Sequence, residues 1–184
     1  MQALVAKKIA VLGSSSAEQS SPAAVKAYAI GKLIAGRGAT LLTGACPGLP
    51  HAAVRGALDV RGLTVGISPA MDRDEHASVY RYPDASTIMI YTGMGRKGRN
   101  VVLIRSADAC VFLNGSIGTL NEFTIAFDEL HSGGAIGILS GVGGIADELP
   151  RLISLADREP VVPVVCEAEP ERLMEIIFTY LCNR

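Results

Sequence analysis

The chain has 184 residues, of which 49% are hydrophobic and 19% charged, and its formal net charge is −1. This length and hydrophobic content predict one domain over residues 1–184 and argue against disorder. The sequence lacks the usual signs of binding to nucleic acid or to an anionic membrane surface, because its net charge is near zero, its aromatic content is 5% and it has no tryptophan.

The hydrophobic content does not indicate a membrane-spanning segment. The longest uncharged stretch, residues 130–146, contains six glycines and a histidine, which makes it a poor spanning helix. The N-terminal segment has neither the long apolar core nor the cleavage site of a signal peptide. The four cysteines and three histidines are scattered without the spacing of metal ligands. We therefore expect a cytoplasmic protein without a metal site.

Short apolar runs alternate with helical stretches along the whole chain. The runs cover residues 8–13, 39–44, 63–68, 87–92, 109–114, 135–140 and 161–166. The helical stretches cover residues 22–38, 51–62, 97–108, 118–131, 143–157 and 170–184. Most runs are continuously hydrophobic, which is typical of strands covered on both faces. The pattern predicts a Rossmann-like α/β fold with a doubly wound, mostly parallel sheet of about seven strands and helices on both faces.

Ligands of such sheets bind beyond the carboxyl ends of the strands. Five of the six loops expected there are rich in glycine or serine, which favours an anion held by backbone N–H groups and hydroxyls. The first loop supplies Gly13 and Ser14, and in the second Gly44 and Gly48 allow the backbone to approach a ligand closely. The third, residues 69–86, is long and irregular and could fold over a site.

The sequence Gly93-Met-Gly-Arg-Lys-Gly98 follows the fourth expected strand. Its GxGxxG pattern is weak evidence for a dinucleotide site, since it does not follow the first strand and no acid lies about 20 residues further on. Arg96, Lys97 and Arg99 cluster at the start of the next helix, where cations oppose the helix dipole. A bound anion or an acid could offset that cost, although a solvated basic turn explains Arg96 and Lys97 equally well.

The segment Asn114-Gly-Ser-Ile-Gly-Thr119 connects the fifth expected strand to a helix. Gly115, Ser116, Gly118 and Thr119 suit a phosphate held at the helix N-terminus. Glu122 lies three residues after Thr119, so both share one face of the helix near its start. The alternative is that Ser116 only caps the helix and that Glu122 faces solvent.

Taken together, these motifs resemble the LONELY GUY family and its wider group of Rossmann-like proteins, often mislabelled lysine decarboxylases. The resemblance spans nearly the whole chain and is carried by "VLGSSS", by "TGACPGL" with the "VRGA" and "TVGISP" that follow it, and above all by "GRNVVLIRSADACVFLNGSIGTLNEF". In that family a PGGxGTxxE loop binds a nucleotide phosphate, and its glutamate acts together with an upstream arginine. The resemblance places the arginine at Arg99 and the glutamate at Glu122.

The chain also departs from that pattern. Asn114 replaces the proline of the loop motif, and Ser116 replaces its second glycine. Asn100 follows the arginine where the cytokinin-activating members have lysine, and Arg96 stands at a methionine position. The "GRN" and "RSAD" signatures are more similar to the branch that contains the molybdenum cofactor carrier proteins. A serine at position 116 would be strained if its φ were positive.

Two functions follow from the resemblance. The first is hydrolysis of the N-glycosidic bond of a nucleoside 5′-monophosphate, with Arg99 and Glu122 catalytic and with no cofactor required. The second is a non-catalytic module, either a carrier of a phosphorylated cofactor such as molybdenum cofactor or a nucleotide-responsive protein. Both predict a small phosphorylated ligand, and the resemblance implies a homodimer or a tetramer.

Overall fold

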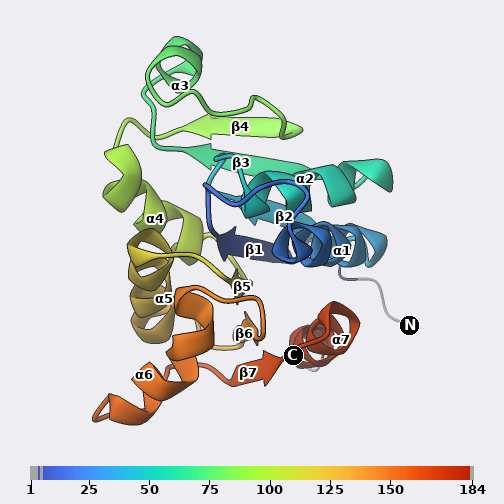
Figure 1. Cartoon of the computed structure of the whole chain (residues 1–184), viewed down its shortest axis with the longest axis vertical. Helices are drawn as coiled ribbons and strands as arrows, with labels where there is room; N and C mark the ends of the chain where they lie inside the picture. Colours follow the sequence, from blue (N-terminus) through green and yellow to red (C-terminus); the bar gives the residue numbers. More distant parts are fainter. Residues whose placement is uncertain (1–3, 5, 183–184) are drawn as a thin grey trace.

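The computed structural model of the protein describes residue 4 and residues 6–182. This part of the chain forms one seven-stranded sheet in the order β4-β3-β2-β1-β5-β6-β7, and every neighbouring pair is parallel (Figure 1). The strands are β1 (Lys8–Gly13), β2 (Thr40–Thr43), β3 (Thr64–Ser68), β4 (Ile88–Tyr91), β5 (Ala109–Leu113), β6 (Ala135–Leu139) and β7 (Val164–Glu167). The expected α/β fold with a doubly wound parallel sheet is confirmed.

The helices lie on both faces of the sheet, with α4, α5 and α6 on one face and α1, α2 and α7 on the other (Figure 1). Their bounds are α1 (Pro22–Gly36), α2 (Leu49–Asp59), α3 (Arg73–Ser78), α4 (Gly95–Arg105), α5 (Ile117–Glu129), α6 (Leu149–Leu155) and α7 (Pro170–Cys182), with one 3₁₀ turn, η1 (Ile145–Glu148). Each face carries its own apolar core, so the middle strands are buried on both sides, as their unbroken hydrophobicity predicted.

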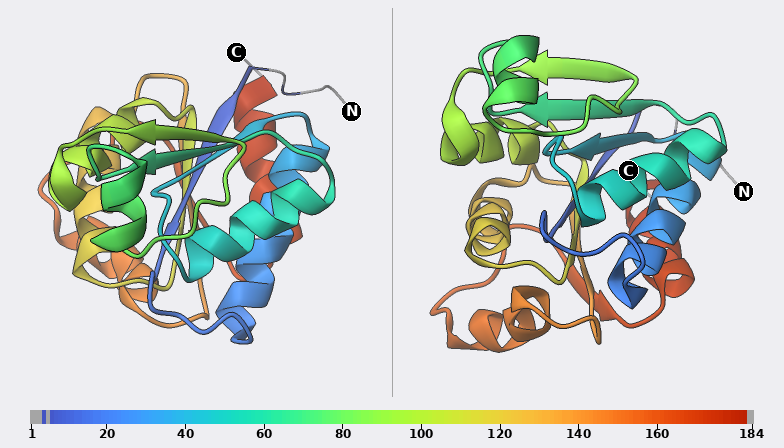
Figure 2. Two further views of the ribbon diagram at one scale, coloured as in Figure 1. Left: turned by 90° about the horizontal axis from the view of Figure 1, so that it is seen from above. Right: turned by 45° about the horizontal axis from the view of Figure 1, so that its top comes forward.

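Helices α1 and α2 pack side by side with their backbones in close contact (Figure 2). A Cβ atom on Gly31 would lie 1.9 Å from the carbonyl oxygen of Ala53, and one on Gly56 would lie 2.0 Å from that of Tyr28. The two glycines therefore let the helices approach more closely than any side chain would allow. This packing fixes α2, which follows the second site loop, relative to the sheet.

Three expectations differ from the structure in detail. The segment 69–86 is not wholly irregular, because Asp72 caps the short helix α3 and accepts a hydrogen bond from the Glu75 amide. The last strand begins at Val164 rather than at residue 161, since Pro163 has no N–H for the sheet ladder. The helical stretch 143–157 divides into η1 and α6.

Across the described residues, no helix is both long enough and apolar enough to span a bilayer.

Candidate functional site

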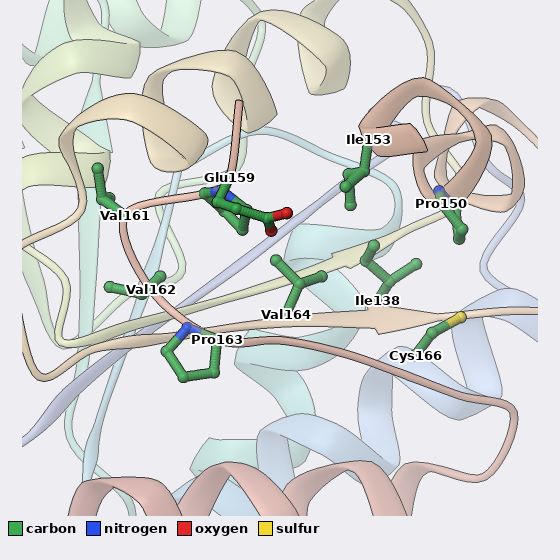
Figure 3. A pocket seen from close by; sticks show the side chains of 10 residues that line it. Ile138, Pro150, Ile153, Glu159, Val161, Val162, Pro163, Val164 and Cys166 are labelled. Carbon is green, nitrogen blue, oxygen red and sulfur yellow. The ribbon is translucent and has the colours of Figure 1, made fainter. Parts of the chain in front are cut away.

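One cavity, of about 580 Å³, lies beside the edge strand β7. Figure 3 shows Ile138, Val164 and Cys166 of the strands facing Pro150 and Ile153 of α6 across it. Glu159 is the one charged side chain among the described residues that line it. Ligand sites combine apolar walls with several convergent polar groups, so this cavity is the weaker candidate despite its size.

A second cavity, of about 450 Å³, lies where the chemistry predicted from the sequence converges. It opens at the carboxyl ends of β1 and β5, between which the strand order changes direction. Doubly wound sheets place their ligands at such a switch point. Its lining comprises Gly13, Ser14, Ser15, Cys46, Tyr82, Arg96, Lys97, Arg99, Asn100, Ser116, Gly118, Thr119 and Glu122. We take this as the candidate site.

The loop between β5 and α5 forms one wall of the cavity. Ser116 is the N-cap residue of α5, and within the described chain its side chain makes no capping hydrogen bond. Its φ of −142° is extended backbone, so the strain expected for a serine at this position does not occur. Gly118 faces open space, with no described heavy atom within 4 Å of a Cβ built there. The first amides of α5 and the hydroxyl of Ser116 are therefore available to an anion.

The left-handed conformation falls instead on Asn114, with φ of 52°, and on Gly115, with φ of 86°. Asn114 Nδ2 donates to the carbonyl oxygen of Val142 over 2.7 Å, and its Oδ1 accepts from the Gly115 amide over 2.7 Å. Asp147 holds the loop 141–144 by accepting from the Gly141 and Gly143 amides, each over 2.9 Å. The departure from proline at position 114 is thus part of the loop geometry, since proline cannot adopt a positive φ.

Arg99 and Glu122 form the inner wall, on α4 and α5 respectively. Arg99 Nη1 lies 4.0 Å from Glu122 Oε1, and the two residues are only 5% and 8% exposed. Arg99 Nε and Nη1 are buried and donate to no acceptor in the part of the chain that the structure describes. Gly44 makes room for this arginine, because a Cβ there would lie 1.6 Å from Nη1. Buried charged donors without acceptors cost free energy.

Burial raises the pKa of Glu122 to about 7, although Arg99 and Lys97 act in the opposite direction. Asn100, 3% exposed, lies directly beside it. In the amide orientation that also donates to the Arg96 carbonyl, Asn100 Nδ2 donates to Glu122 Oε1 over 3.1 Å. A neutral amide stabilises the carboxylate less than a cation would. Glu122 is therefore able to hold or release a proton near neutral pH.

The outer rim comes from the segment 69–86 and from the first turn of α4. His76, fully buried, ties the segment down with Nδ1 2.9 Å from Ser68 Oγ, and its ring lies edge-on to that of Tyr82. Tyr82 reaches the cavity, and Arg96 lies over the Tyr80 ring at 5.5 Å. The expectation that this segment could fold over a site agrees with the place of Tyr82. Arg96 and Lys97 also reach the cavity.

Seven of the ten predicted site residues line the cavity: Gly13, Ser14, Arg99, Ser116, Gly118, Thr119 and Glu122. The other three, Gly44, Gly48 and Gly115, do not, because protein atoms fill the space beside them: Arg99 at Gly44, the Ser14 carbonyl at Gly48 and the Thr119 side chain at Gly115. The Cβ side of each of these three glycines therefore faces protein atoms. Whether any of the ten residues binds a ligand stays a prediction.

Sequence reasoning did not single out Ser15, Cys46, Tyr82 or Asn100 as site residues. Asn100 carries the clearest missed signal, because it follows the predicted arginine directly on a helix that points at the site. Burial raises the pKa of the Cys46 thiol to about 11, so Cys46 is a protonated, uncharged wall residue at neutral pH. Among the described residues, no three His, Cys, Asp or Glu side chains gather as a metal site requires.

The SLOG cluster4 family matches residues 6–171, which is most of the chain. The protein belongs to the SLOG cluster4 family. An uncharacterized protein of Archaeoglobus fulgidus is 36% identical over 103 residues, which is 56% of this chain and 63% of that relative. The chain thus matches less than two thirds of that relative's length.

Solved structures place this SLOG cluster4 chain near two kinds of protein. TM1055, a structural genomics target, has a TM-score of 0.81 at 24% identity over 94% of this chain and 99% of that one, which shows the shared fold. The molybdenum cofactor binding protein of Rippkaea orientalis has a TM-score of 0.71 at 29% identity, over 94% and 96% of the two chains. The Moco carrier protein of Chlamydomonas reinhardtii has a TM-score of 0.73 at 26% identity, over 97% and 99%.

Proposed function

We propose that the protein binds a small phosphorylated ligand, a nucleotide or a phosphorylated pterin cofactor, with its phosphate at the N-terminus of α5. The observation that carries the anionic character of the ligand is the Arg99 guanidinium, which is buried in the cavity wall with Nε and Nη1 donating a hydrogen bond to no acceptor among the described residues. An anion in the cavity would compensate that charge. The open space at Gly118 and the uncapped start of α5 support the N-terminus of α5 as the position of its phosphate.

The carrier form of this function has independent support. The solved structures of a molybdenum cofactor binding protein and of a Moco carrier protein resemble this chain at 29% and 26% identity over nearly its whole length. A carrier needs a phosphate clamp and a shaped cavity but no reacting groups. In this form of the function, Glu122 lies beside the body of the ligand and Arg99 pairs with an anionic group of it, and the molybdenum cofactor is cargo rather than a catalytic group.

Glu122 supports a second candidate function, hydrolysis of the N-glycosidic bond of a nucleoside 5′-monophosphate. Water would add to the anomeric carbon as the bond to the base breaks, which yields the base and ribose 5-phosphate through a cationic sugar. A carboxyl group with a pKa of about 7 is ionised in part at neutral pH, so it could accept the proton of the water and stabilise the cation. Arg99 would favour its ionised form.

One experiment separates these candidates. The purified protein is incubated with a panel of nucleoside 5′-monophosphates, free base is followed by chromatography, and ligand binding is followed by calorimetry. Two variants test the role of Glu122: Glu122→Gln, and the control Glu175→Gln, which changes an exposed acid on α7. Hydrolysis would be established if the parent protein and Glu175→Gln release base and Glu122→Gln does not. Binding without base release would leave the carrier or sensor function. If neither inorganic phosphate nor any phosphorylated ligand binds, the proposed function is wrong.

We also propose a homodimer or tetramer in the cytoplasm, as the family resemblance implies. The edge strand β4 supports association, because Ile88 and Ile90 are 46% and 44% exposed on one face of the strand. Apolar side chains of an edge strand are the kind of surface that a second copy covers. Light scattering coupled to size exclusion at several protein concentrations tests this proposal, and a monomer at all of them would overturn it.

A further inference from the structure

Positive charge is concentrated in the candidate site although the chain as a whole carries −1. Among the described residues that line the cavity, Arg96, Lys97 and Arg99 are cationic and Glu122 is the single acid. The lining therefore has a formal charge of +2 even when Glu122 is ionised. The excess comes entirely from the first turns of α4, whereas the phosphate position proposed above lies at the start of the neighbouring helix α5.

This cluster is costly without a ligand. The first turn of α4 contains no acidic residue, and its N-cap Met94 makes no side-chain capping bond within the described chain. Cations at a helix N-terminus oppose its dipole, and Arg99 in addition is only 5% exposed, with two nitrogens that donate to no hydrogen-bond acceptor among the described residues. An acceptor that enters the cavity beside α4 would relieve both costs. Guanidinium groups pair best with oxyanions, which accept two parallel hydrogen bonds.

The phosphate position proposed at α5 uses other residues than this second cluster. The proposed phosphate position uses Ser116, Gly118 and Thr119, whereas Arg99 belongs to α4. Glu122 stands one turn into α5, with Oε1 4.0 Å from Arg99 Nη1. A carboxylate repels a second anion in contact with it, so anionic groups of a ligand would lie on either side of Glu122. The middle of the ligand, beside Glu122, would offer hydroxyl or N–H groups.

We infer that the ligand carries two separate anionic groups, a phosphate at the N-terminus of α5 and a second oxyanion held by Arg96, Lys97 and Arg99. The inference rests on the proposed function and narrows its ligand class. The inference favours a ligand with a charge at each end over a ligand with one charged end, such as a nucleoside 5′-monophosphate.

Three probes built on one nucleoside test this inference: its 5′-monophosphate, its 5′-diphosphate and its 3′,5′-bisphosphate. The nucleoside is the one that binds best in the panel described above. The diphosphate and the bisphosphate both add a phosphate, but only the bisphosphate separates the two groups. We expect the bisphosphate to bind at least about tenfold more tightly than the monophosphate, and more tightly than the diphosphate. Calorimetry in a buffer free of phosphate measures all three.

Paired variants locate the effect. The double variant Arg96→Gln with Lys97→Gln should weaken the binding of the bisphosphate much more than that of the monophosphate and so remove the advantage of the bisphosphate, because only the bisphosphate has a second group for these cations to hold. The control is Lys32→Gln with Arg61→Gln, two exposed cations outside the lining, which should change neither affinity.

The outcomes separate this inference from the proposed function. Equal affinity for monophosphate and bisphosphate would overturn the inference and leave the proposed function standing. Equal gains from diphosphate and bisphosphate would also overturn it, since charge alone would then suffice without a separated second position. If none of the probes binds, the nucleotide form of the proposed function fails, and this inference fails with it.

Discussion

Glu122 and Arg99 come from the neighbouring helices α5 and α4 and face each other in the cavity wall, with 4.0 Å between Oε1 and Nη1. At this distance they attract each other without a hydrogen bond. Each is buried enough to need a partner, yet neither fully satisfies the other. The pair is thus arranged for a third participant, which the proposed ligand would supply.

The raised pKa of Glu122 predicts how stability depends on pH. The folded state keeps this proton up to about pH 7, whereas the unfolded chain releases it near pH 4.5. The stability that the proton provides is therefore complete below pH 4.5 and is lost as the pH rises through 7. Between these limits the ligand-free protein should lose about 2 to 3 kcal/mol from this group.

Urea denaturation at a series of pH values measures this loss. Glu122→Gln should flatten the decline between about pH 5 and pH 7, whatever its absolute stability, because glutamine does not titrate. Glu175→Gln on the exposed face of α7 should keep the slope of the parent protein. An unchanged slope in Glu122→Gln would show that Glu122 titrates as an ordinary acid.

Gly118→Ala should separate stability from ligand binding. The new methyl group meets no described protein atom within 4 Å and enters the cavity, while alanine favours the helix by up to about 1 kcal/mol. We expect a protein as stable as the parent or more so, with ligand affinity at least about tenfold weaker. Gly36→Ala, equally free of described neighbours but at the end of α1, should leave affinity unchanged. Unimpaired binding by Gly118→Ala would place the phosphate elsewhere.

Gly44→Ala should displace Arg99 rather than disrupt the fold. The added Cβ would lie 1.6 Å from Nη1 and 2.6 Å from Cζ, and the guanidinium is the flexible end of its side chain, so it would move. We expect a loss of about 1 to 3 kcal/mol in stability and a further rise in the pKa of Glu122, as its cation withdraws. Carbon-13 NMR of the carboxyl group checks the pKa. A lower pKa would contradict the assigned role of Gly44.

Asn114→Pro restores the proline of the related loop motif but should damage this protein. Proline cannot adopt the φ of 52° found here, and the substitution removes the bond from Nδ2 to Val142. We expect a loss of about 2 to 4 kcal/mol in unfolding free energy, measured in urea. Ser116→Gly, which also restores a motif residue, should cost no more than about 1 kcal/mol, because its φ of −142° needs no glycine. Tolerance of the proline would show that the loop has another conformation.

The fold could be predicted from the sequence because the signals for it are local and repeated. Unbroken apolar runs such as residues 109–114 marked buried parallel strands, and the alternation with helices determined the class. Short segments were less clear: α3 spans six residues around His76, too few for a periodic pattern. Strand β7 starts late because Pro163 has no N–H to donate to a neighbouring strand. The effect of that missing donor depends on where the strand lies in the sheet.

Parts of the candidate site depend on approach between distant segments, which no local pattern records. Glycines at 44 and 48 were expected to let a ligand approach closely, which stays a prediction; the groups that approach them within the protein are Arg99 and the Ser14 carbonyl. Tyr82 reaches the cavity because His76 anchors its segment against Ser68. The partner of each side chain follows only from the folded geometry.

The central position of β1 bears on when the site can form during synthesis. Gly13 at the end of β1 pairs in register with Leu113 at the end of β5, so the two loops that meet at the cavity leave the ribosome far apart in time. A nascent chain that stops before β5 displays the first loop and the basic turn of α4 but lacks the helix at which we propose that the phosphate binds. Capture of the proposed ligand would therefore be a late event, and the ligand would link the early segments to the late ones as a noncovalent crosslink.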